Sequence, residues 1–208
     1  LSLLDRHVQF ALVSARQAMA QAGLSPDPER TAVIMGTGGG GLITSDEAYR
    51  AVYAEGKSRV HPFTVPRLMH SAAASHISME MGLMGPTFSV SSACASSNHA
   101  IGLAVQMLRA GIADVALAGG SEAMLSFGGL KAWEGLRVMS PDACRPFSMG
   151  RNGMVQGEGA AVFVLEDREA ALARGARVLA EICGVGMTSD ASDIVMPNPE
   201  GASRAMQR

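Results

Sequence analysis

The chain has 208 residues, of which 48% are hydrophobic and 17% charged, and its formal net charge is −2. This length allows one or two domains, and this balance excludes an intrinsically disordered chain. The charge gives no reason to expect a nucleic-acid partner, no apolar run reaches the roughly 18 residues of a membrane span, and no leader pattern opens the chain. We therefore expect a cytoplasmic protein.

Helices and strands alternate along the first half of the chain. Within residues 1–24, apolar residues recur at three- and four-residue steps, which predicts an amphipathic helix closed by Gly23. The pattern then predicts, in order, a buried strand over 31–36, the glycine-rich loop 36–41, a proline-bounded extended segment over 61–66 and a helix over 67–81.

The alternation continues in the second half. The pattern predicts a strand over 86–92, a central helix over 95–110, strands over 113–120 and 159–166, a helix over 167–175 and a strand over 176–187. This order indicates the α/β class, with strands buried on both faces. The chain opens without a methionine, and its last residues look like a helix cut off in its first turns. We expect a piece of a longer protein.

Cys94 lies where the strand that ends at Ser92 gives way to the helix that begins near Ala95. A thiol there faces the first N–H groups and the positive end of the helix dipole, which stabilise a thiolate. Its small neighbours leave room for a bulky electrophile. The alternative is a small buried packing residue, the commonest role of free cysteine. The other two cysteines, Cys144 in a polar loop and Cys183 in an expected strand, complete neither a disulfide framework nor a zinc site.

The glycine-rich loop 36–41 follows a strand, as phosphate-binding loops do. A dinucleotide fingerprint also needs a helix packed closely behind the loop and an acidic residue after the next strand, and the GKS at 56–58 lacks the glycine turn of a P-loop. A close backbone approach to a ligand or to a neighbouring segment is the better interpretation.

The segment GPTFSVSSACASSNHAIG (85–102) resembles the nucleophile segment of β-ketoacyl-acyl carrier protein synthases, the condensing enzymes of fatty-acid and polyketide assembly. Further segments resemble the same family in the same order: 60–86, 113–123, 140–176 and 187–201. The resemblance covers nearly the whole chain and is closest to the elongating, bacterial type II branch.

This resemblance implies a thiolase-like fold with α-β-α-β-α layers, two similar halves and a homodimer. The N-terminal half would span 1–166, and the second half would begin over about 167–208. Cys94 would accept an acyl chain from acyl carrier protein as a thioester, and the carbanion formed by decarboxylation of malonyl-carrier protein would attack it. The backbone N–H of Cys94 would be one oxyanion donor. No cofactor or metal is implied.

The family takes two histidines, a lysine and a second oxyanion donor from its C-terminal half, and none has a counterpart here. His99, five residues after Cys94, corresponds to a structural histidine of the family. We therefore expect the chain alone to be inactive.

The resemblance also places residues around the acyl channel. Gly39 stands where the family has a larger apolar gate residue, and Thr64 where it has an aromatic residue contributed across the dimer, with Val65 beside it. Trp133 takes another aromatic lining position. Two of these changes remove bulk, which predicts a wider channel for long, branched or polyunsaturated acyl groups. The alternative is that neighbouring side chains repack and leave the volume unchanged.

Other departures concern the subgroup and the partner. Ser148, Asn152 and Met154 replace two acidic residues and a phenylalanine of the common pattern, which resembles the rhizobial nodulation ketosynthases. Arg59 and Arg137 match positions that help to dock acidic carrier protein, although a lone arginine is also an ordinary surface charge.

Three alternatives stay open. A thiolase would share the fold and a reactive cysteine but act on coenzyme A. A non-catalytic chain-length subunit would usually lack the cysteine. A structural half-domain would be inert as isolated.

Overall fold

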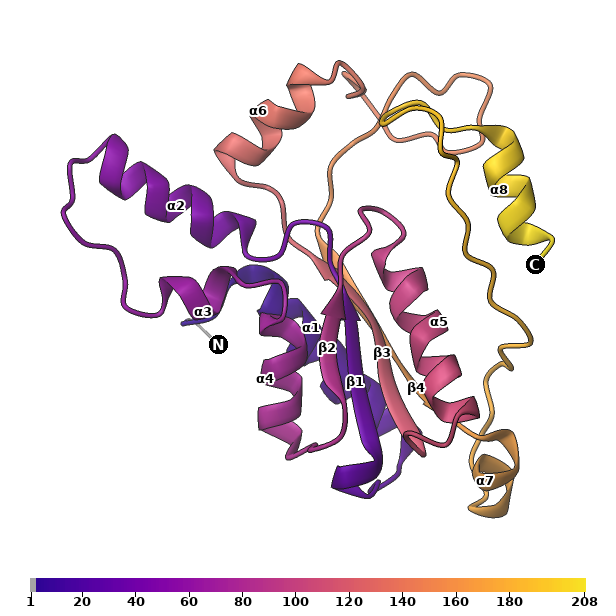
Figure 1. Cartoon of the computed structure of the whole chain (residues 1–208). Helices are drawn as coiled ribbons and strands as arrows, with labels where there is room; N and C mark the ends of the chain where they lie inside the picture. The colour runs from indigo at the N-terminus through magenta and orange to yellow at the C-terminus, as the bar shows by residue number, and fades with distance from the viewer. Residues whose placement is uncertain (1–2) are drawn as a thin grey trace.

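A four-stranded mixed sheet lies at the centre of the computed structural model, which describes residues 3–208 (Figure 1). The strands, in spatial order, are β2 (Thr87–Val90), β1 (Thr31–Gly36), β3 (Val115–Glu122) and β4 (Gly159–Glu166). The first three are parallel, and β4 runs antiparallel to β3. In this register Ile34 lies between Phe88 and Ala118. The three parallel strands therefore end at the same edge of the sheet.

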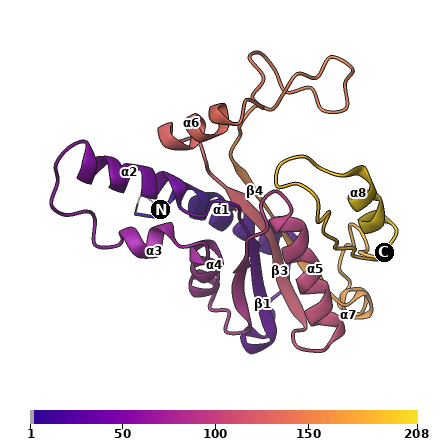
Figure 2. The ribbon, with the colours of Figure 1, turned by 45° about the horizontal axis from the view of Figure 1, so that its top comes forward.

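Helices cover both faces of the sheet, as Figures 1 and 2 show. The three packed helices are α1 (Arg6–Ala22), α4 (Ala72–Met81) and α5 (Ser96–Arg109). Because side chains alternate along a strand, Val33 and Met35 of β1 pack with α1 and α4, whereas Ala32 and Ile34 pack with α5. Alanines dominate the α5 side of the core, so this helix lies close to the sheet.

The remaining helices lie outside this layered core (Figure 1). They are the 3-10 turn η1 (Pro28–Arg30), α2 (Leu42–Tyr53), α3 (Thr64–Leu68), α6 (Phe127–Gly135), α7 (Arg168–Ala173) and α8 (Pro199–Met206). Helices α2 and α6 lie beyond the carboxyl ends of the parallel strands, and α3 lies beside the start of α4. Helix α8 confirms the helical end of the chain. Within residues 3–208, no helix is both long enough and apolar enough to cross a bilayer.

The prediction of an extended segment over 61–66 is wrong for its second half, because α3 begins at Thr64. The hydroxyl of Thr64 donates to the backbone carbonyl of His61 at 2.7 Å and so supports the first turn. Pro66 lies within that first turn, where a proline removes no helical hydrogen bond. The proline therefore favours the helix rather than ending an extended segment.

The single helix expected over 67–81 is also wrong, since the chain is extended at Met69 and resumes as α4 only at Ala72. The break turns the chain from α3 into the layer that covers the sheet. Helix propensity alone gives no sign of this turn, because no glycine or proline marks it.

The strand expected over 176–187 is absent, and the segment runs without a sheet partner among the described residues. It lies along α5 instead: Arg109 donates to the carbonyl of Cys183 at 3.3 Å, and Val185 contacts the helix at Gly102. An apolar run forms a strand only where a neighbouring strand offers its N–H and C=O groups.

The prediction that the strands are buried on both faces is confirmed for β1 and for most of β3. It is wrong for the two edge strands. β2 is half-buried throughout, and Phe163 of β4 is 54% exposed. Each of these strands has only one neighbour in the sheet, so less chain covers it.

Candidate active site

Cys94 lies in the turn between β2 and α5, at the edge where the parallel strands end, and its side chain is exposed. The residue before it, Ala93, has φ +51°, in the left-handed region that costs an L-residue roughly 1–2 kcal/mol. The strained turn projects the thiol away from the core at the start of a helix. The interpretation of Cys94 as a buried packing residue is therefore wrong.

Ser96 holds this turn from beneath, where it is only 3% exposed. Its hydroxyl accepts from the backbone N–H of Ser92 at 2.9 Å and donates to the carbonyl of Ala93 at 2.6 Å. The carbonyl of Thr37 is a second acceptor at 3.3 Å. One side chain thus joins the last residue before the turn, the strained residue and the neighbouring β1 edge.

His99, the histidine nearest to Cys94 in sequence, supports the same turn. A hydrogen bond of 2.7 Å joins its Nδ1 to the hydroxyl of Ser92. This contact agrees with a structural role for His99.

Two glycines allow α5 to start directly on the sheet. A Cβ at Gly36 would lie 2.4 Å from the backbone carbon of Ser96, and one at Gly120 would lie 2.7 Å from the Cβ of Ser97. Both distances are shorter than any van der Waals contact. Sequence reasoning missed these residues, although a glycine at the carboxyl end of a buried strand is the usual sign of such an approach.

The glycine-rich loop is held by a carboxylate at the end of β3. The side chain of Glu122 accepts from the N–H of Gly38 at 2.6 Å and of Gly39 at 3.3 Å, and from the hydroxyl of Thr37 at 3.2 Å. On the other side, a Cβ at Gly41 would lie 2.4 Å from the Cα of Leu68. The expected close approach of backbone to a neighbouring segment is confirmed, and the loop amides are occupied by protein.

A second buried carboxylate, Asp5, connects two helices. It caps α1 by accepting from the N–H of His7, and it accepts from both the N–H and the hydroxyl of Thr44 in the first turn of α2, at 2.9 and 2.6 Å. Burial alone would raise the pKa of Asp5, but the hydrogen bonds from His7 and Thr44 outweigh it and lower the pKa from 3.8 to about 2. Asp5 is therefore ionised and fixes the helix that follows the glycine loop.

The predicted channel residues lie in three places. Gly39 belongs to the loop at the cysteine turn, because a Cβ at the adjacent Gly38 would lie 3.8 Å from the Cα of Ala93. Thr64 is buried at the start of α3 and Val65 beside it is exposed. Trp133 is half-buried on α6. Helices α3 and α6 both pack against α2. The nearest neighbours of a Cβ at Gly39 would be Glu122, Met124 and Leu42, so the loop meets the cysteine turn at Gly38 rather than at Gly39.

The two predicted docking arginines are both exposed. Arg59 lies in the connection from α2 to α3, and Arg137 follows α6. Within residues 3–208, no group of three or more His, Cys, Asp or Glu side chains could hold a metal ion.

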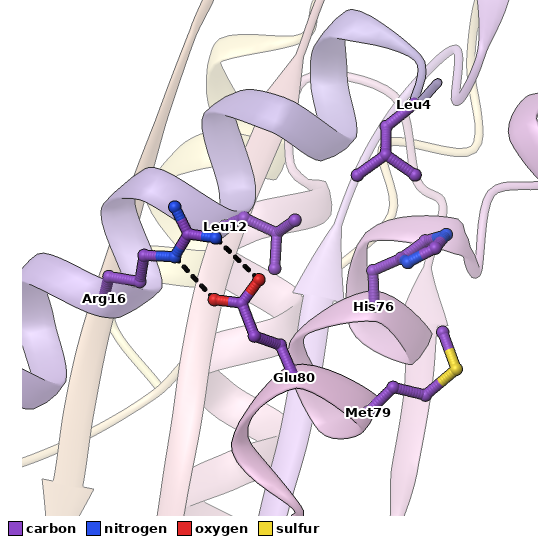
Figure 3. A pocket seen from close by; sticks show the side chains of 6 residues that line it. All are labelled: Leu4, Leu12, Arg16, His76, Met79 and Glu80. Carbon is purple, nitrogen blue, oxygen red and sulfur yellow. Dashed lines mark hydrogen bonds and ion pairs between the residues drawn. The ribbon is translucent and has the colours of Figure 1, made fainter. Parts of the chain in front are cut away.

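A hollow with a volume of about 350 Å³ lies elsewhere. Its lining residues come mainly from α1 and α4 (Figure 3), which cover the face of the sheet opposite α5. Arg16 and Glu80 bridge its two walls through a bidentate ion pair of 2.5 and 2.7 Å. None of the predicted site residues lines it, so it is not part of the site around Cys94.

Known proteins resemble both the sequence and the fold. The family described as β-ketoacyl synthase, N-terminal domain, matches residues 1–171. Nodulation protein E of Rhizobium leguminosarum bv. trifolii is 53% identical over 98% of this chain and 52% of its own length. The 3-oxoacyl-[acyl-carrier-protein] synthase 2 of Staphylococcus aureus is 40% identical, over 98% of this chain and 53% of its own length.

Solved structures give the same result. The ishigamide ketosynthase/chain length factor superposes with a TM-score of 0.93 at 31% identity, over 100% of this chain and 52% of that one. A β-ketoacyl synthase from Burkholderia phymatum STM815 gives 0.89 at 33% identity, over 98% and 52%. The AntDE:AntF complex of a type II PKS acyl-carrier protein with its ketosynthase gives 0.80 at 29% identity, over 90% and 50%.

The chain thus spans about half the length of the relatives that it matches. Over that half, these likenesses confirm the predicted α/β, thiolase-like ketosynthase fold. The chain belongs to the β-ketoacyl synthase family, of which it carries the N-terminal domain.

Proposed function

We propose that the polypeptide carrying this chain is a 3-oxoacyl-[acyl-carrier-protein] synthase with Cys94 as its nucleophile. The Cys94 thiolate attacks an acyl-carrier-protein thioester, takes the acyl group and releases the carrier thiol. Malonyl-carrier protein loses carbon dioxide, and the resulting carbanion attacks the acyl thioester and expels the Cys94 thiolate. The observation that carries the proposal is the exposed cysteine on a strained turn at the start of α5, in a member of a condensing-enzyme family.

The geometry supports this role for the turn. Cys94 lies in the turn just before α5, whose N-cap is Ala95. An N–H group held in such a turn is suited to bind the oxyanion of a tetrahedral intermediate. Ser96 and His99 hold the turn through hydrogen bonds with Ser92. A pre-organised donor is worth more than a mobile one, because no reorganisation is needed when charge develops.

We further propose that the enzyme uses long or unusual acyl chains, as a member of the nodulation subgroup. The 53% identity to Nodulation protein E supports the subgroup. The missing side chain at Gly39 is what supports a wide channel: glycine adds no atom to the space beside Glu122 and Met124, which a Cβ would meet at 3.4 and 3.6 Å. A larger side chain would occupy that space. In the complete enzyme, Gly39→Ile should therefore shift the preferred acyl chain towards shorter lengths, and an unchanged profile would mean that the channel lies elsewhere.

The proposed partners are acyl carrier protein and a second subunit. Exposed Arg59 and Arg137 would contact the acidic carrier, and the AntDE:AntF complex contains a carrier protein with its ketosynthase. We propose a homodimer, for which the outer edge of β2, unpaired among the described residues, is available. Light scattering distinguishes this from a monomer, and co-purification of a different subunit would indicate a heterodimer instead. We also propose that the N-terminal half ends near residue 166. We propose a cytoplasmic location for the protein.

Intact mass spectrometry tests the central proposal in the complete polypeptide. Incubation with long-chain acyl-carrier protein should add one acyl group, and the Cys94→Ala variant should lack the adduct. Because Cys144 and Cys183 are also exposed, Cys144→Ser and Cys183→Ser are matched controls that should keep it. Transfer from acyl-coenzyme A but not from carrier protein would indicate a thiolase. No adduct, with Cys94 slow towards iodoacetamide, would indicate a non-catalytic subunit.

A further inference from the structure

Glu122 has an unusual environment for a carboxylate. Its side chain lies at the end of β3, and within the described residues 3–208 it is bonded only to the glycine loop, through the N–H groups of Gly38 and Gly39 and the hydroxyl of Thr37. Among residues 3–208 it has no ion-pair partner within 4.0 Å. A half-buried charge is retained only where hydrogen bonds replace its water. The loop supplies those bonds, so the carboxylate and the loop depend on each other.

The segment that Glu122 holds also touches the cysteine turn. The N–H of Thr37 donates to the carbonyl of Val90 at 3.1 Å, and the Thr37 carbonyl lies 3.3 Å from the hydroxyl of Ser96. A Cβ at Gly38 would lie 3.8 Å from both the Cα and the carbonyl oxygen of Ala93. Residues 37–39 therefore lie between the carboxylate and the residue that precedes Cys94.

The glycines of the loop have no side chains with which to pack. They are consecutive, from Gly38 to Gly41, and Gly40 has φ +58°. Glycine loses more conformational freedom on ordering than any other residue. At its far end the loop is held by the N–H of Gly41, which donates to the carbonyl of Leu68 at 3.1 Å. Thr37 is held by Val90 and Ser96, and the N–H groups of Gly38 and Gly39, which follow it, are held by Glu122.

We propose that Glu122 is a positioning residue, which fixes the glycine loop against the cysteine turn and so sets the rate of acyl transfer to Cys94. The proposal rests on the proposed function, since it concerns the same site. Glu122 acts through the loop rather than on the substrate. Its loss should therefore lower the rate of the step at Cys94, while the binding of carrier protein, which would involve distant surface arginines, should be unchanged.

Glu122→Gln is the informative substitution. It keeps the shape of the side chain but replaces one acceptor oxygen by an NH₂ donor, which faces the N–H and O–H donors of Gly39 and Thr37. In the complete polypeptide, the maximal rate of Cys94 acylation by long-chain acyl-carrier protein should fall about 10- to 100-fold, the size expected for a misplacement near 1 Å. The concentration of carrier that gives half the maximal rate should stay within about twofold of the wild-type value. Glu122→Asp keeps a carboxylate and should recover part of the rate.

Glu158→Gln is the matched control. Glu158 is another largely buried carboxylate, bonded to the N–H of Leu125 at 3.2 Å and to Arg6 at 2.8 Å, and it does not bond to the glycine loop. The Glu158→Gln substitution should leave the maximal rate of Cys94 acylation within about twofold of the wild-type value. Equal losses in Glu158→Gln and Glu122→Gln, or no loss in Glu122→Gln, would overturn the positioning role.

Amide hydrogen exchange of Gly38 and Gly39, measured on the same proteins, does not depend on activity. Their exchange should accelerate at least tenfold in Glu122→Gln and stay at the wild-type rate in Glu158→Gln. If the wild-type protein forms no acyl-enzyme, the proposed function fails. The exchange experiment then still decides whether Glu122 fixes the loop. Unchanged exchange of the Gly38 and Gly39 amides in Glu122→Gln would reject this role of Glu122 as well.

Discussion

Replacing Gly36 by alanine should displace the start of helix α5 and, with it, Cys94. The new Cβ would lie 2.4 Å from the backbone carbon of Ser96 and 2.4 Å from the backbone nitrogen of Ser97. Ordinary contacts begin near 3.4 Å, so the strand and the helix must separate by about 1 Å. Both opposing atoms belong to the main chain, so no change of rotamer can relieve the contact.

The magnitude follows from two opposing effects. Overpacking of this kind costs about 1–3 kcal/mol. Alanine also restricts the unfolded chain relative to glycine, which stabilises the protein by about 0.4–1 kcal/mol where the backbone conformation is compatible. The net loss for Gly36→Ala should be about 1–2 kcal/mol. A shift of the nucleophile by about 1 Å should lower acyl transfer to Cys94 about 100-fold.

Gly39→Ala makes the same chemical change without the clash. Its Cβ would meet only side chains: Glu122 at 3.4 Å, Met124 at 3.6 Å and Leu42 at 3.8 Å. We expect this variant to be as stable as the wild type or more stable by up to about 1 kcal/mol. Urea unfolding of both variants in the complete polypeptide measures the difference. If Gly36→Ala proves as stable as Gly39→Ala and is acylated at the same rate, α5 does not depend on direct contact with β1.

Three further substitutions test the elements that hold the site. Asp5 has a folded pKa of about 2, below its usual 3.8, so its stabilising effect is present above about pH 4 and is lost as the pH falls towards 2. Asp5→Asn should cost about 2 kcal/mol at pH 7, and the gap in melting temperature should narrow below pH 4; a pH-independent gap would contradict an ionised Asp5. Ser96→Ala leaves a buried main-chain N–H without its acceptor and should cost about 1–3 kcal/mol in urea unfolding, whereas Ser97→Ala should stay within about 0.5 kcal/mol. Ala93→Gly removes the left-handed strain at φ +51° and should raise stability by up to about 1 kcal/mol; a loss of stability would show that the strain is small.

The parts of the fold that local pattern determines were predictable from the sequence. The strands expected over 31–36 and 159–166 coincide with β1 and β4. Apolar runs of strand length, bounded by glycines or charged residues, leave little choice of structure. The helix expected over 95–110 was equally well placed, because Gly111 stops it. The residues at the ends of these elements therefore mark where each element begins and ends.

The wrong predictions concern elements whose state depends on a distant partner or on an ambiguous signal. The apolar segment 176–187 has strand character but no neighbouring strand among residues 3–208. Pro66 was interpreted as a mark of extended chain, although a proline fits equally well in the first turn of a helix. A sequence window contains neither the partner strand nor the direction of the turn.

The same limit applies to the site. Cys94 could be predicted as a candidate because a cysteine between a strand and a helix has a local explanation, and because its segment resembles a known nucleophile segment. Glu122 could not, because its bond to Gly38 spans 84 positions of the chain. Ser96 reads as an ordinary helix-start serine until β1 and the cysteine turn are seen to meet at its hydroxyl.

The energies involved indicate why a carboxylate stands at position 122. Ordering the four glycines from Gly38 to Gly41 costs about 1–2 kcal/mol for each residue, or roughly 4–8 kcal/mol together. Hydrogen bonds to a charged acceptor contribute about 1.5–3 kcal/mol each, and Glu122 accepts three from Thr37, Gly38 and Gly39. Their total, roughly 5–9 kcal/mol, is of the same size as the cost. Glu122 therefore supplies a large share of the free energy that orders the loop beside Cys94, together with the bonds of Gly40 to Thr37 and of Gly41 to Leu68. An acceptor weakened by even one bond, as in Glu122→Gln, leaves the loop partly mobile while the sheet beneath it stays folded.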